Sequence, residues 1–134
     1  MSMKRLILIL SIFLLTACSS NQIPEGFVES EIKKKVEEVV GLINEFKLDE
    51  VTSMFRDDLK TMVKVADLET IIQTKIDQVG QFKEISQIAI TDTKDPNTSE
   101  VYAVAIVVCE HEKGKTTYTL SFNEGLELVG FFIK

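Results

Sequence analysis

The residues best suited to chemistry lie together in one short stretch, Cys109-Glu110-His111-Glu112. His111 is the only histidine of the chain, and a histidine positioned beside a carboxylate often serves as a general base. Side chains that are neighbours on a β-strand point to opposite faces, so Glu110 and Glu112 are expected on the side away from His111. The sequence therefore predicts an exposed histidine beside a hairpin turn, and it predicts no catalytic residue.

Metal binding is also not predicted. Cys109 shares a strand face with His111, but a zinc site needs three or four convergent ligands, and two are too few. Asp57-Asp58 and Asp92 with Asp95 supply carboxylates, yet no D-x-[DN]-x-[DN]-G calcium loop is present. We therefore expect no metal and no cofactor, with the acids solvated in loops and Cys109 a small buried apolar residue.

The other cysteine, Cys18, stands where the composition of the chain changes. Residues 1–5 carry two positive charges, residues 6–15 form an apolar run broken only by Ser11, and small residues precede Cys18. This is the three-part layout of a secretory signal. The apolar run is shorter than the ~20 residues that span a bilayer, so a transmembrane anchor is not expected.

The stretch Leu15-Thr16-Ala17-Cys18 resembles the lipobox of bacterial lipoproteins. The resemblance implies cleavage between Ala17 and Cys18 and attachment of a diacylglyceryl group to the Cys18 thiol. Two acyl chains, such as palmitate, hold a protein on a membrane, whereas one binds only reversibly. The expectation is a signal peptide over residues 1–17, a tether over 18–26 and a domain over 27–134, anchored at the extracytoplasmic face of the cell membrane.

Charge excludes one class of partner. The chain has a net charge of −6, and removal of residues 1–17 takes away two positive charges and no negative one, which leaves −8. Such an acidic surface gives no electrostatic attraction to nucleic acid. Once Cys18 is acylated, Cys109 has no cysteine to pair with, so stability must come from packing rather than from an internal disulfide.

The first half of the domain has the period of helices. Apolar residues recur at steps of three and four between Phe27 and Phe46, with charged residues of both signs on the other face. A shorter helix is expected from Asp49, as its cap, to Phe55, and a third from about Asp67 to Val79, where Gly80 ends it. The stretch "RDDLKTMV" between them is ambiguous, and Gly41 suggests either close packing or a bend in the first helix.

After Gly80 the period changes to two and β-branched residues take over. Four strands are expected, "QFKEISQIAITD", "EVYAVAIVVCEH", "TTYTLSF" and "LELVGFFIK", separated by the turns "KDPNTS", "EKGK" and "NEG". Helices followed by a meander of strands predict an α+β domain, in which about three N-terminal helices pack on a four-stranded antiparallel sheet.

The second strand is apolar on both of its faces, because Tyr102, Val104 and Ile106 alternate with alanine and valine. A single helical layer covers only one face of a sheet. The first helix wrapping a curved sheet, a pocket or a second subunit would cover the other. We expect a pocket or an interface to be lined by Tyr102, Val104, Ile106, Tyr118 and Phe131.

From about residue 46 to the end, the chain resembles the bacterial domain of unknown function numbered 3887. The resemblance is carried by "INEFKLDEVTSMFRDDLK", by "VGQFKEI" and by "VVCEHEKGKTTYTLSFNEGLELVGFFIK". It implies the cystatin-like cone that nuclear-transport-factor-two-like domains share, in exported or lipid-anchored proteins that sometimes precede α/β-hydrolases. Val65 departs from the threonine expected before the third helix. The cystatin inhibitor loop Q-x-V-x-G is absent, and so is the hydrolase motif G-x-S-x-G.

These observations favour a lipid-anchored extracytoplasmic module that binds or associates without catalysis of its own. Its expected partners are the membrane, through lipid on Cys18, and a second copy of the chain, with no nucleic acid. The alternatives are a cone-shaped pocket that binds a small molecule or performs catalysis, and an accessory role for an α/β-hydrolase on another chain.

Overall fold

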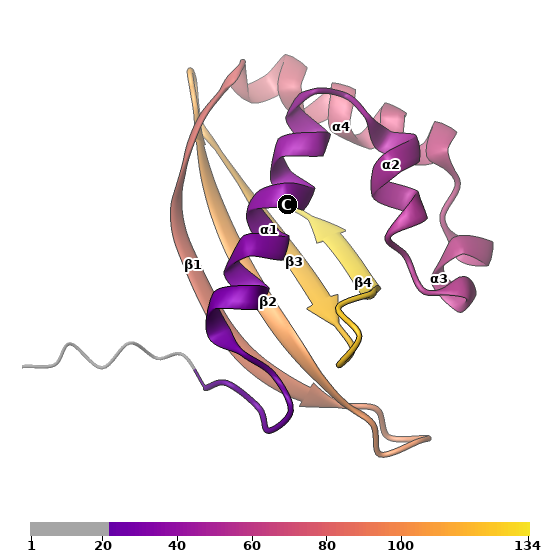
Figure 1. Ribbon diagram of the computed structural model, residues 1–134. Coiled ribbons are helices and arrows are strands. Elements are labelled where there is room, and N and C mark those ends of the chain that lie inside the picture. Colours follow the sequence, from indigo (N-terminus) through magenta and orange to yellow (C-terminus); the bar gives the residue numbers. More distant parts are fainter. Residues whose placement is uncertain (1–21) are drawn as a thin grey trace, which may run out of the picture.

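The computed structural model describes residues 22–134, which form four helices followed by one antiparallel sheet (Figure 1). The helices come first and the strands follow, so the predicted α+β order is confirmed. The elements are α1 Glu29–Asn44, α2 Leu48–Ser53, α3 Asp57–Met62, α4 Val65–Val79, β1 Phe82–Lys94, β2 Val101–His111, β3 Lys115–Phe122 and β4 Leu128–Ile133.

The sheet is a meander in the order β1-β2-β3-β4, with every neighbouring pair antiparallel. It therefore has two edges, β1 on one side and β4 on the other. Phe55, between α2 and α3, forms a short parallel bridge with Leu128 at the start of β4. This bridge extends the β4 side of the sheet by one short segment and places α3 beside it.

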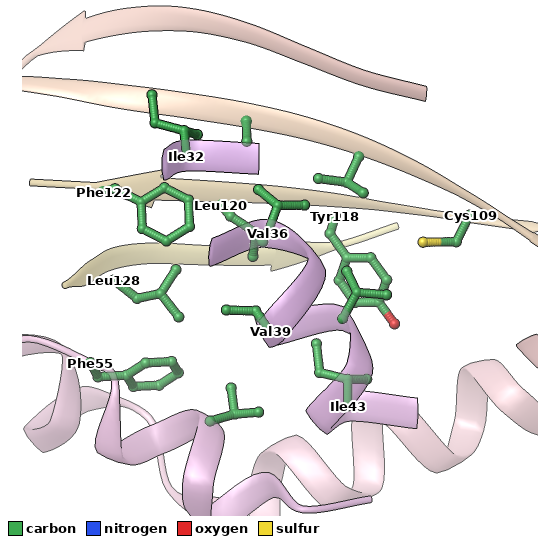
Figure 2. Packing of buried hydrophobic residues seen from close by; sticks show 14 of the residues in the cluster. Ile32, Val36, Val39, Ile43, Phe55, Cys109, Tyr118, Leu120, Phe122 and Leu128 are labelled. Carbon is green, nitrogen blue, oxygen red and sulfur yellow. The ribbon is translucent and has the colours of Figure 1, made fainter. Parts of the chain in front are cut away.

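The apolar stripe predicted for the first helix forms the centre of the core. Its residues Ile32, Val36, Val39, Val40 and Ile43 are each at most 1% exposed. Burial of each such side chain contributes about 1.5–3 kcal/mol. Figure 2 shows the four that it labels, Ile32, Val36, Val39 and Ile43, between the strands and the other helices, so the helices cover a single face of the sheet.

The charged face of α1 is solvated, as predicted. Lys33 pairs with Glu29 over 3.0 Å and Lys35 with Glu38 over 3.2 Å, at spacings of four and three residues. Such exposed pairs add only a few tenths of a kcal/mol. Gly41 is exposed and a Cβ there would meet nothing within 4 Å, so close packing does not account for this glycine.

The structure defines the segment that was ambiguous in the sequence, and it shows that two predicted helix starts were wrong. The ambiguous segment forms a fourth helix, α3, which buries none of its residues. Asp49 lies inside α2, whose N-cap is Lys47 without a side-chain cap bond. The helix α4 begins at Val65, two residues earlier than expected, and Gly80 follows it with a φ of +81°.

The segment expected to be a tether is partly built into the domain. Ile23 packs against the core, Pro24 is buried, and the Gln22 N–H donates to the Ile90 carbonyl of β1 over 3.0 Å. Residues 22–26 therefore belong to the folded unit, and the remainder of the expected tether lies outside the described residues.

Candidate interaction surface

The two faces of β2 have different neighbours. Ala103, Ala105, Val107 and Cys109 are fully buried against the helices. The alternate residues point to the opposite side of the sheet, where no helix lies. We call this side the open face, and its central residues are defined by the strand register.

Two rows of side chains cross all four strands at the centre of the open face. The register aligns one row as Ala89, Ile106, Thr119 and Phe132, and the next as Thr91, Val104, Ser121 and Gly130. No residue of either row is charged. Phe132 is 72% exposed and Ile106 38%, whereas Val104 in the neighbouring row is 9% exposed.

A cluster around Arg56 closes one end of the open face. The Arg56 guanidinium donates to both Asp58 carboxylate oxygens, over 2.7 and 2.9 Å, and to the Tyr102 hydroxyl over 3.2 Å. It also reaches Glu100 at 3.3 Å, and the Tyr102 hydroxyl donates to the same carboxylate over 3.1 Å. Hydrogen bonding to Asp58 raises the pKa of Arg56, and burial raises the pKa of Tyr102.

A charged pair stands at the other end of the same face. Lys115 lies 3.4 Å from Glu110, its partner in the β2–β3 register, and Glu84 is the neighbour of Glu110 on β1. The open face is therefore an uncharged band between two charged borders. This arrangement, an apolar centre with a polar rim, is characteristic of protein interfaces.

The five residues expected to line one pocket or interface are divided between the two faces. Tyr102, Val104 and Ile106 lie on the open face. Tyr118 is 2% exposed and lies on the helix side of the sheet in Figure 2, with its ring 6.1 Å from that of Phe131. Burial raises the pKa of Tyr118 above its ordinary value, so its hydroxyl stays protonated.

The five expected lining residues include Phe131 rather than its neighbour Phe132, and the sequence assigned no role to Arg56. Phe131 and Phe132 are adjacent in β4, so alternation already requires that one of them face the core and the other the open face. Only the register with β3 decides which, and it pairs Phe132 with Thr119. Arg56 carried no local signal, because its partners Glu100 and Tyr102 are far away in the chain.

His111 is buried, and the expectation of an exposed turn residue was wrong. It is 6% exposed, its Nδ1 lies 2.9 Å from the Gly80 carbonyl, and its Nε2 lies 2.9 Å from the Thr116 hydroxyl. A carbonyl only accepts, so Nδ1 carries a proton and donates to the Gly80 carbonyl. Phe82 packs edge-on against the ring at 5.9 Å. Both nitrogens are engaged with protein atoms.

Cys109 is fully buried and its thiol is free of any disulfide, which agrees with the predicted role of a small apolar residue. Burial raises the pKa of the Cys109 thiol to about 11. The thiolate is the reactive form, so this cysteine is a poor nucleophile and a poor metal ligand at neutral pH.

Two of the acidic residues considered as ligands, Asp58 and Asp95, have local structural partners. Asp58 is held by Arg56, which lowers the pKa of that carboxyl. Asp95 accepts hydrogen bonds from the backbone of Asn97 over 2.8 Å and of Thr98 over 3.4 Å, within the β1–β2 turn. Across residues 22–134 no three His, Cys, Asp or Glu side chains gather closely enough to hold a metal ion.

The described chain has an open depression of about 900 Å³. It lies among the loop before α1, the β1–β2 turn and the β3–β4 turn, and it is lined by carboxylates such as Glu25, Asp92, Glu100 and Glu124. None of the five predicted pocket residues lines it. It is polar and wide open, unlike the enclosed, mostly apolar sites that bind small molecules.

The predicted signal peptide, the cleavage site at Ala17 and the lipidation site at Cys18 lie outside the described residues. Among residues 22–134 no helix has the length and apolar character needed to cross a bilayer.

The fold and the open face define an α+β domain with helices on one side of an antiparallel meander. The sequence profile of the family described as "Protein of unknown function (DUF3887)" matches residues 36–131, and the chain belongs to this family. A solved structure, "NMR structure of protein from Ruminococcus gnavus ATCC 29149", is similar with 23% sequence identity and a TM-score of 0.71. The match covers 84% of this chain and 96% of that one, which supports the fold. No functionally curated protein matches the chain.

Proposed function

We propose that the protein is a lipid-anchored extracytoplasmic module that associates with a second copy of itself through the open face of the sheet and has no catalysis of its own. The observation that carries the proposal is the uncharged band across four strands, with Phe132 72% exposed on the edge strand β4. Localisation rests on the resemblance of residues 15–18 to a lipobox.

The size of the open face suits a dimer. Four strands about 4.8 Å apart, each averaging about nine residues at about 3.3 Å, give a face of roughly 600 Å². This approaches the ~800 Å² that each partner contributes to a standard stable interface. Two packed sheets of this kind form a sandwich about 10 Å thick with interdigitated side chains.

Charge at the open face permits a second copy as the partner. The acidic net charge of the chain opposes self-association where charged surfaces meet, but the two central rows of the open face carry no charge. A two-fold dimer places the same patch on both sides of its interface. Because these rows are uncharged, such an interface buries no charge without a partner. The threonine and serine hydroxyls in the rows can hydrogen-bond across it.

The absence of catalysis is proposed from the state of the candidate residues. His111 has both nitrogens bonded inside the protein, and the pKa of Cys109 keeps it a thiol at neutral pH. A general base must reach the proton that it removes, and an active nucleophile must be accessible. Neither residue meets these conditions.

Sedimentation of the chain beginning at Ser19 tests the dimer at micromolar concentration. We expect a dimer, and we expect Ile106→Lys with Phe132→Lys to convert it to a monomer with an unchanged circular dichroism spectrum. Met62→Lys is the matched control, because Met62 is 77% exposed on α3, away from the open face, and should leave the dimer intact. A wild-type chain that remains monomeric contradicts the proposal.

Membrane fractionation tests the anchor. In the host, Cys18→Ser should move the full chain from the membrane fraction to the soluble fraction, while Cys109→Ser should leave it on the membrane. Normal membrane partitioning of the Cys18 variant would contradict lipidation. The two variants change the same residue type, so any difference between them reports the position of the thiol.

A further inference from the structure

The folded domain is fastened to its N-terminal segment along the outer edge of β1. The Gln22 N–H donates to the Ile90 carbonyl over 3.0 Å, Ile23 packs against the core and Pro24 is buried. The Phe27 N–H then donates to the Pro24 carbonyl over 3.2 Å, just before α1 begins. Because β1 is an edge of the sheet, the chain enters the domain from that edge.

The connection to the proposed lipid is short. Only Ser19, Ser20 and Asn21 lie between Cys18 and Gln22 in the sequence. A fully extended chain covers at most about 3.6 Å per residue, so Gln22 lies within about 14 Å of Cys18. The 13 residues of β1 extend about 43 Å at 3.3 Å each. We call residues 18–22, which connect the proposed lipid to the domain, the leash. The leash is much shorter than the domain, so only the surface around Gln22 can face the membrane.

Two sides of the domain satisfy this limit. One is the β1 edge together with the adjoining side of α1, where Lys33 and Glu37 line a shallow hollow with residues 85–88. We call it the β1 side. The other is the hairpin end, where residues 24–26, the β1–β2 turn and the β3–β4 turn meet. Figure 1 shows α2 and α3 at the opposite side of the molecule from β1, beyond the reach of the leash.

Charge distinguishes the two sides. Residues 22–27, 95–100 and 123–125 at the hairpin end contain carboxylates and no lysine or arginine. On the β1 side lysines stand among the carboxylates, as Lys33 and Lys83 accompany Glu29, Glu37 and Glu84. A leaflet that contains anionic lipid repels carboxylates and attracts lysine, by about 1 kcal/mol for each basic residue near the surface.

We propose that the β1 side is the surface of the domain that faces the lipid bilayer. This inference rests on the proposed acylation of Cys18. In this orientation the strands run along the membrane and the sheet stands on its β1 edge, so the open face is presented sideways to other molecules in the same membrane. The edge strand β1, a template for pairing with foreign strands, is at the same time turned toward the lipid.

Energy transfer in vesicles tests the orientation. The acylated full chain is reconstituted in vesicles of phosphatidylethanolamine and phosphatidylglycerol that carry an acceptor dye on the headgroups. A donor dye is placed singly through Gln87→Cys on β1, Asn97→Cys in the hairpin turn or Met62→Cys on α3. All three positions are exposed, whereas the native Cys109 is fully buried and is not labelled.

We expect the strongest transfer from position 87, weaker transfer from 97 and severalfold weaker transfer from 62. Stronger transfer from 97 than from 87 would show that the hairpin end faces the lipid, and equal transfer from all three would show that the domain turns freely. Either result overturns the orientation while the anchor stands. A labelled protein that stays in the soluble fraction overturns the anchor and the orientation together.

Lengthening the leash supplies a second test. Insertion of about twelve Gly and Ser residues between Ser20 and Asn21 gives a flexible segment with a mean end-to-end distance of roughly 20 Å. We expect this variant to bind vesicles as before, with the differences in transfer among the three positions reduced at least twofold. An unchanged pattern of transfer would show that the short leash does not set the orientation, and would overturn the argument.

Discussion

The guanidinium carbon of Arg56 lies 5.5 Å from the centre of the Tyr102 ring, and its Nη1 donates to the Tyr102 hydroxyl over 3.2 Å. Arg56 follows α2 and Tyr102 is near the start of β2, 46 residues later. The contact therefore connects the helical half of the chain to the sheet half. It also lies at a charged border of the open face.

Replacing Tyr102 by Phe keeps the ring beside Arg56 and removes only the hydroxyl. We expect a loss of about 1 kcal/mol in the free energy of unfolding, since one hydrogen bond to a charged group and one between Tyr102 and Glu100 are removed. Arg56→Ala should cost more, about 2 kcal/mol, because the cation–π contact is lost as well. Urea unfolding of both variants and of the double variant measures the coupling.

The control for this series is Lys47→Ala. Lys47 forms an ion pair of 2.9 Å with Glu45, but both side chains are more than half exposed. Exposed pairs of this kind often contribute nothing measurable. A loss from Lys47→Ala as large as that from Arg56→Ala would show that the Arg56 cluster is an ordinary surface ion pair, and an additive double variant would show that Arg56 and Tyr102 act independently.

His111 is predicted to stabilise the protein without taking part in a reaction. His111→Phe keeps the aromatic contact with Phe82 but leaves the Gly80 carbonyl and the Thr116 hydroxyl without their partner. Buried polar groups without partners cost about 1–3 kcal/mol each, so we expect a loss of at least 2 kcal/mol in urea unfolding. The dimer should persist under native conditions. Unchanged stability would show that these two hydrogen bonds do not hold the turn.

The elements were predictable where local sequence carries the information. The apolar stripe of the first helix, which ends at Ile43, and the change to a period of two after Gly80 both indicate which residues face the core. The packing of the helices and strands agrees with both patterns. The helix α3 was not predictable in this way, because none of its residues is buried. Its position depends on the Arg56 N–H, which donates to the Leu128 carbonyl over 2.8 Å, a contact between distant parts of the chain.

The candidate surface was only half predictable for the same reason. Alternation on β2 identified Tyr102, Val104 and Ile106 as a second apolar face without knowledge of the fold. Tyr118 and Phe131 were expected in the same pocket or interface, but the register places them on the helix side, because alternation within a strand does not say which set faces the helices. The burial of His111 was unpredictable, since it depends on the carbonyl of Gly80, which ends a helix 31 residues earlier.

Stability should fall in alkaline solution because of Cys109. Burial raises the pKa of its thiol from 9.0 to about 11, so the folded protein keeps a proton that the unfolded chain has released. The contribution is complete below pH 9 and is lost as the pH rises through about 11. The raised pKa of Tyr118 acts in the same direction at higher pH.

Urea unfolding at pH 8 and at pH 10.5 measures this dependence. The wild-type protein should lose about 1–2 kcal/mol more between these pH values than Cys109→Ala does. The same burial should protect the thiol from iodoacetamide at pH 8 until the protein is unfolded. Rapid alkylation of the folded protein, or an equal pH dependence in both proteins, would contradict the burial of Cys109.

Two glycines are predicted to respond to alanine in opposite directions. Gly41 is exposed inside α1, and a Cβ there meets nothing within 4 Å, so Gly41→Ala should stabilise the protein by about 0.5–1 kcal/mol through its greater helix propensity. Gly80 has a φ of +81°, and a Cβ there would lie 3.0 Å from the Cβ of Glu112. Gly80→Ala should therefore destabilise it by more than about 1 kcal/mol. Urea midpoints of the two variants, compared at equal slope, measure both effects. Because the two substitutions add the same methyl group, a shift of both midpoints in the same direction would contradict the assigned backbone conformation at one of the two positions.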